Sequence, residues 1–185
     1  MLRAHLSVRL FVFTALILSS TSAFAADGVF MVVKGDVKVD AKGKITPARV
    51  GSKVSPSDKI ISGKDSRAKV VMSDKNVLNI SPDTQIVIEK YVYDAKNDKK
   101  DVSLNVIYGK VRATVNQKYD GDKSKFQVKT PSAVAGVRGT DFLTSYNQST
   151  GSSKIVTFEG AVQMGSGVDA SGNIANPVMV SPGQF

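Results

Sequence analysis

The chain has 185 residues, no cysteine, one histidine, and 25 basic against 16 acidic residues, which gives a net charge of +9. Without cysteine there is no disulfide, and after His5 the chain has no Ser–His or Cys–His pair and lacks the usual zinc, copper and iron ligands. We therefore expect no catalytic residues, no metal centre and no cofactor. Paired carboxylates or a Ser–Lys pair are the enzymatic alternatives, but no spacing singles out either one.

Residues 1–25 have the organisation of a secretory signal peptide. Two arginines precede the apolar run 10–18, and a small-x-small triplet ends at Ala25, which predicts cleavage before Ala26. The alternative is an uncleaved anchor, but this run is much shorter than the ~20 residues that cross a bilayer. We expect residues 26–185 to form one mature domain that is periplasmic or secreted.

Apolar and polar residues alternate with a period of two after residue 28, which indicates strands with one buried and one wet face. The expected strands are 29–33, 67–73, 77–80, 85–93, 102–108, 111–115, 125–129, 141–146, 154–159, 161–164 and 178–180. No stretch carries an apolar stripe of helical period long enough to predict a helix. The pattern predicts an all-β fold, a twisted solenoid-like or sandwich stack of short strands in a single domain.

The charged segment Asp94–Asp101 joins two strongly alternating segments and is expected to be the exposed tip of a hairpin. Its carboxylates, and those of Asp120 and Asp122, are oxygen ligands of the kind that calcium takes. Lysines interleave or flank both groups and compete for the same carboxylates. A solvated, charged turn is therefore the preferred interpretation, with calcium as the alternative.

The triplet Gly-x-Val occurs at Gly35, Gly109 and Gly160, each time before a predicted strand. The intervals between the three positions are unequal. The triplet therefore does not indicate a regular structural repeat.

One ordered set of motifs is distinctive. Lys129–Phe142 has the sequence KTPSAVAGVRGTDF, with the segments 50–68 and 72–84 upstream and 159–162 downstream. In this order the motifs resemble the FecR-type periplasmic domain family, with Ser62 where that family usually has threonine. The resemblance covers roughly residues 28–183.

The resemblance implies an all-β outer module that docks on another envelope protein. Regulators of that family carry a cytoplasmic anti-sigma domain and one membrane span before this module. Here only about nine residues precede the apolar run. We therefore expect an exported outer module without those parts, and no relay of a signal across the inner membrane.

The signature residues are candidate structural and interaction positions: Thr130, Pro131, Gly136, Arg138, Gly139, Thr140, Phe142, Glu159 and Gly160. Thr130 is expected to end a strand because the proline after it cannot donate to a sheet. Gly136 and Gly139 allow close approach or a positive φ. Arg138 stands among small apolar residues, which predicts a buried cation that pairs with Glu159 or clamps carbonyls. The alternative is an arginine that recognises a ligand.

Without the arginines of residues 1–25 the net charge is +7, supplied mostly by lysines spread along the chain. Such a field favours anionic partners, but export and the lack of an aromatic-plus-basic motif argue against nucleic acid. We expect a non-catalytic module that binds another envelope protein in a signalling or scaffold role. The alternative is a binder of anionic glycan or lipid headgroups, such as peptidoglycan or lipopolysaccharide, through exposed lysines.

Overall fold

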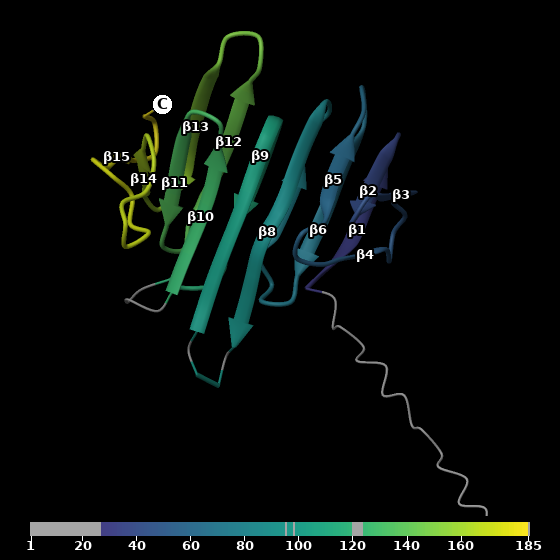
Figure 1. Cartoon of the computed structure of the whole chain (residues 1–185), viewed down its shortest axis with the longest axis horizontal. Coiled ribbons are helices and arrows are strands. Elements are labelled where there is room, and N and C mark those ends of the chain that lie inside the picture. The colour runs from purple at the N-terminus through teal and green to yellow at the C-terminus, as the bar shows by residue number, and fades with distance from the viewer. Residues whose placement is uncertain (1–26, 95, 98, 120–123, 185) are drawn as a thin grey trace, which may run out of the picture.

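The computed structural model describes residues 27–94, 96–97, 99–119 and 124–184, which form strands and no helix (Figure 1). The strands are β1 Gly28–Lys34, β2 Val37–Ala41, β3 Lys44–Pro47, β4 Lys53–Val54, β5 Lys59–Ser62, β6 Arg67–Met72, β7 Val77–Ile80, β8 Thr84–Asp94, β9 Lys99–Thr114, β10 Ser124–Thr130, β11 Ala133–Val137, β12 Asp141–Asn147, β13 Ser152–Glu159, β14 Val162–Gly165 and β15 Val178–Val180. Within these ranges, no helix is long and apolar enough to span a bilayer. The predicted signal peptide lies outside the described residues.

The strands form two sheets that share β9. The first sheet has the order β4-β1-β6-β7-β9-β12-β13, and the second has the order β3-β2-β5-β8-β9-β10-β11-β14-β15. Neighbouring strands are antiparallel except β9 and β10, which are parallel. Buried apolar residues of both sheets, such as Phe30 and Phe142 from the first and Ile86 and Phe126 from the second, form one core cluster. The all-β prediction is confirmed.

The chain passes between the two sheets at sharp corners, and the three Gly-x-Val triplets mark three of them. Gly35 lies between β1 and β2 with φ +77°, Gly109 lies inside β9 with φ +87°, and Gly160 lies before β14 with φ +78°. Before Gly109, β9 pairs with β8 and β10; from Gly109 on, it pairs with β7 and β12. The triplet therefore recurs for a local reason, because each corner needs a left-handed backbone that glycine adopts without strain.

The predicted strands are all present, with 102–108 and 111–115 as the two halves of β9. Five strands lack a sequence prediction: β2, β3, β4, β5 and β11. The first four are only two to five residues long. β11 does not alternate in polarity because both of its faces are covered; Val134 and Ala135, which point to opposite sides, are 8% and 1% exposed.

The predicted hairpin between β8 and β9 is present (Figure 1). The carboxylate of Asp94 accepts hydrogen bonds from the backbone N–H groups of Lys96 and Asn97, at 3.0 and 3.2 Å, and from the side-chain amide of Asn97 at 2.7 Å. These bonds, led by the Asn97 amide, lower the pKa of Asp94. The carboxylate therefore closes the turn. Asp98, Asp120 and Asp122, which belong to the calcium alternative, lie outside the described residues.

Candidate functional site: a groove beside the β14–β15 connection

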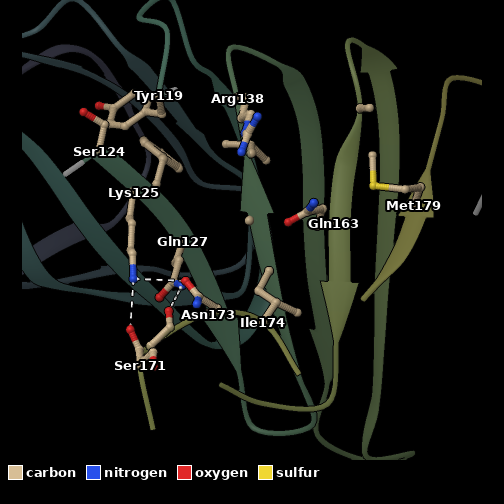
Figure 2. A pocket seen from close by; sticks show the side chains of 15 residues that line it. Tyr119, Ser124, Lys125, Gln127, Arg138, Gln163, Ser171, Asn173, Ile174 and Met179 are labelled. Atoms are coloured by element: carbon tan, nitrogen blue, oxygen red, sulfur yellow. Dashed lines mark hydrogen bonds between the residues drawn. The ribbon is translucent and has the colours of Figure 1, made fainter. Parts of the chain in front are cut away.

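The segment 166–177, which connects β14 to β15, folds over the outer face of the second sheet (Figure 2). Lys125 of β10 donates hydrogen bonds to the carbonyl of Ser171 at 3.1 Å and to Oδ1 of Asn173 at 3.3 Å. Gln127, also on β10, donates its amide to the carbonyl of Gly172 at 3.0 Å. Two polar side chains of one strand thus hold the connecting segment in place.

Gly136 of β11 makes room for an apolar contact with the same segment. A Cβ atom at this position would lie 2.7 Å from Cδ1 of Ile174, a distance that real side chains do not tolerate. The absence of a side chain therefore lets Ile174 lie directly on the β11 backbone. The close approach that the sequence predicts at Gly136 is confirmed.

Next to the segment 166–177 lies an open groove of about 640 Å³ (Figure 2). Its polar lining comes from Ser124, Lys125, Gln127, Arg138, Gln163 and Asn173, and its apolar lining includes Tyr119, Ile174 and Met179. The guanidinium of Arg138, amides and apolar side chains suit a polypeptide or another ligand with a negative group. None of the described residues supplies a histidine or cysteine nucleophile, since the chain has neither after His5.

Arg138 is exposed at this groove, so the prediction of a buried Arg138 is wrong. Within the described ranges its side chain makes no hydrogen bond or ion pair, and Glu159 is exposed as well. The reason is the alternation of β11: Ala135 and Val137 point into the core, so the next residue points outward. The small residues crowd the inner face and leave Arg138 free on the outer side.

The predicted pair of Arg138 with Glu159 is not formed; the arginine that pairs in this region is Arg112 of β9, and its partner is Asp141. Its Nε and Nη2 donate to Oδ1 and Oδ2 of Asp141, at 2.8 and 2.6 Å. The same guanidinium lies 4.2 Å from the ring centroid of Phe158. Because the Arg112 side chain is 45% exposed, the pair contributes no more than about 1 kcal/mol. Asp141 follows the signature Thr140 directly, but sequence alone does not reveal its partner.

The other signature residues, apart from exposed Glu159, lie in turns, in corners or in the core. Thr130 ends β10 as predicted; its Oγ1 accepts a hydrogen bond from the backbone N–H of Ala133 at 3.0 Å, and exposed Pro131 begins the turn. Phe142 is fully buried in the core. Three further residues meet at the corners around β12 and β13: Gly139 with φ +68°, buried Thr140, and Gly160, whose backbone lies close to both.

A buried polar cluster lies next to the groove and has no counterpart in the sequence predictions. Asp74, in the β6–β7 turn, is 1% exposed and accepts hydrogen bonds from the hydroxyls of Tyr91, at 2.7 and 2.9 Å, and Tyr119, at 2.9 Å. The side-chain amide of Asn76 donates to the same carboxylate at 2.7 Å. Tyr119 also lines the groove and packs edge-on against Phe126, 5.3 Å between ring centroids. The cluster thus joins the β6–β7 turn to β8 and to the chain that precedes β10.

The tyrosine hydroxyls of this cluster remain protonated donors. Burial raises the pKa of Tyr91 and of Tyr119 far above the ordinary value of 10.0, and the negative charge of Asp74 raises both further. No described cation forms an ion pair with Asp74, so the two hydroxyls and the side-chain amide and backbone N–H of Asn76 replace the water around its carboxylate. A buried carboxylate satisfied in this way rigidifies the turn.

The comparisons with known proteins give the family. Residues 58–163, more than half of the chain, match the family model described as FecR protein, and the chain belongs to this family. Two crystal structures, at 2.50 and 1.65 Å resolution, of a candidate anti-sigma factor from Parabacteroides distasonis ATCC 8503 are similar, with 16% and 17% identity and TM-scores of 0.49 and 0.48. Each comparison covers 67% of this chain and 51% of the solved chain, so the match spans about half of those proteins. No curated protein sequence matches the chain.

Proposed function

We propose that this protein is a non-catalytic interaction module of the bacterial envelope, exported after removal of residues 1–25. It captures an extended segment of another envelope protein in the groove beside β15. The observation that carries the proposal is Arg138, an exposed guanidinium that no described residue pairs with, which lines a groove with amide and apolar walls. Membership of the FecR family supports a signalling or regulatory role at the envelope.

The edge of the second sheet beside the groove suits an added strand. β15 pairs with β14 on one side only and ends the strand order of its sheet. Val178 and Met179 on this strand are 66% and 51% exposed, which is high for large apolar side chains. An extended peptide that pairs with β15 gains main-chain hydrogen bonds, and its side chains gain apolar contacts with Met179.

Arg138 supplies the specificity in this mode of binding. A guanidinium presents a planar fork of donors that matches a carboxylate, so an acidic side chain of the bound segment is its natural partner. Lys125 adds positive charge to the groove but is already engaged with Ser171 and Asn173. The bound segment is therefore expected to be extended, with an acidic residue and at least one apolar residue.

The test compares Arg138→Ala with Arg49→Ala, an exposed arginine in the β3–β4 connection at the other end of the molecule. Envelope crosslinking and pull-down should recover a stoichiometric protein partner with the wild type and with Arg49→Ala. Arg138→Ala should lose at least tenfold in capture, because an anchoring arginine of an interface typically contributes about 2 kcal/mol or more. Its unfolding free energy should change by less than about 0.5 kcal/mol, since the side chain is exposed and unpaired. Capture that survives in Arg138→Ala, or that falls only together with stability, would contradict the proposal.

A further inference from the structure

The cations on the outer face of the second sheet are mostly paired with carboxylates. Four of its lysines form ion pairs with acidic residues on or beside the same face: Lys38 with Asp36, Lys59 with Asp40, Lys90 with Asp101 and Lys129 with Glu89. The two sheets differ in this respect. On the outer face of the first sheet, Arg112 with Asp141 is the ion pair that the described residues form, and most of the other cations there have no acidic partner.

Four cations on the outer face of the first sheet, Arg112 included, form a rectangle. Arg67 and Lys69 lie on β6, Lys110 and Arg112 lie on β9, and β7 runs between these two strands. All four residues are exposed. Since neighbouring strands are about 4.8 Å apart and residues two apart on a strand about 7 Å, the rectangle measures roughly 10 by 7 Å.

The strand between them contributes neutral polar groups at the centre of the rectangle. Asn79 of β7 lies opposite Lys69 on one side and opposite Arg112 on the other. Ser81 follows β7, and its backbone N–H donates to the carbonyl of Lys110 at 3.1 Å. Ser81 therefore lies beside Lys110, as Asn79 lies beside Arg112. A groove of about 570 Å³ crosses the strands here, and Arg67, Lys69, Asn79, Ser81 and Arg112 are among its lining residues.

We propose that this groove binds an acidic polysaccharide that lies across β6, β7 and β9, with its anionic groups between the cations. Arg67, Lys69 and Lys110 form no ion pair with any described residue, so their charges are available to a ligand. The amide of Asn79 and the hydroxyl of Ser81 can hydrogen-bond to sugar hydroxyls. A chain fits a groove across strands better than a planar bilayer does, and the described lining has no aromatic ring on which a nucleobase would stack.

This site is separate from the groove with Arg138, because the two lie on the outer faces of different sheets. The same molecule can therefore hold a polymer on one face and a protein segment on the other. Loss of one kind of binding leaves the other intact, which keeps the two proposals distinguishable.

Polygalacturonate, a linear acidic polysaccharide, is the probe for this site. The triple variant Arg67→Gln, Lys69→Gln, Lys110→Gln is compared with a control of equal charge change, Lys42→Gln, Lys44→Gln, Lys96→Gln, at exposed turn and strand-end positions. The first variant should bind the immobilised probe at least about tenfold more weakly than the wild type, and added salt should weaken wild-type binding strongly, through screening. The control should keep its affinity within about threefold, because its lysines are not part of the rectangle.

Three results would overturn the proposal. Equal losses in both triple variants would mean that net charge alone draws the polymer to the protein. Absence of wild-type binding to polygalacturonate, with binding to phosphatidylglycerol vesicles that depends on Arg67, Lys69 and Lys110, would identify a membrane surface instead. A loss of polymer binding in Arg138→Ala would place the polymer in the other groove. Thermal unfolding of each variant confirms that it is folded when it is assayed.

Discussion

Gly109→Ala is expected to destabilise the fold by more than about 3 kcal/mol, because two penalties coincide at this residue. Its φ of +87° is a conformation that side chains with a Cβ rarely adopt. The added Cβ would lie 2.4 Å from the carbonyl oxygen of Asp83 and 2.6 Å from Cα of Thr84, both backbone atoms that cannot rotate away. The corner that carries β9 from one sheet to the other would have to move. Denaturant-induced unfolding of the two proteins measures the loss.

Gly51→Ala is the matched control for this prediction. Gly51 has the same φ of +87°, but nothing lies within 4 Å of the Cβ that would be added. Only the backbone penalty applies, so its cost should be about 1 kcal/mol. Equal effects of the two substitutions would show that the β9 corner is not as tightly packed as the structure indicates.

Asp74→Ala is expected to lower the unfolding free energy by about 3 kcal/mol, because four buried donors lose the carboxylate that accepts from them. The hydroxyls of Tyr91 and Tyr119 and both the side-chain amide and the backbone N–H of Asn76 donate to this carboxylate. Removal of a buried charge offsets part of the loss, and the Asn76 amide still donates to the two tyrosine hydroxyls, so the effect is smaller than the sum of four separate deletions. Urea unfolding at neutral pH measures the difference.

Lys75→Ala, in the same turn, serves as the comparison. Lys75 is exposed, has φ of 67°, and its side chain makes no ion pair with a described residue. Its replacement should change stability by less than about 0.5 kcal/mol. If Asp74→Ala were as mild as Lys75→Ala, the buried cluster would contribute little to holding the β6–β7 turn against β8.

Period-two alternation predicts the larger strands because each has one face on a common core and one face in water. The signal fails for β11, which is covered on both sides, for β3, which is exposed along its whole length, and for β4, which has only two residues. The alternation changes phase at Gly109, from buried Val102–Val106 to buried Val111–Val115, so it predicts two strands and does not show that one strand serves both sheets. The recurrent Gly-x-Val triplet is the sequence feature that marks the corners where the chain passes from one sheet to the other.

The Arg138 prediction fails for a related reason. Small apolar neighbours indicate burial only when the segment's secondary structure is known, and in a strand they bury alternate positions. Once residues 133–137 are recognised as a strand, the alternation alone places Gly136 and Arg138 on the outer face. The alternative of an arginine that recognises a ligand is therefore the one that the geometry supports.

Contacts between residues far apart in the sequence account for the features that the sequence does not predict. Asp74 and Asn76 belong to a turn sequence, and their partners Tyr91 and Tyr119 come from distant positions that only the fold brings together. In the same way, cations spread along the chain become a set that is mostly paired on one sheet and a rectangle on the other, in which Arg112 is the corner that pairs with a described carboxylate. Strand register decides which charges meet, and it is set by the whole fold.

The most direct measurement of the proposed function is site-specific photocrosslinking in living cells. A photoreactive amino acid replaces Gln163, which is exposed in the groove with Arg138, or Lys42, which is exposed in the β2–β3 turn. The Gln163 position should give one defined adduct with another envelope protein, and the adduct should disappear when Arg138→Ala is added. The Lys42 position should not give that adduct. The same adducts from both positions, or an adduct at Gln163 that persists without Arg138, would contradict a docking groove built around this arginine.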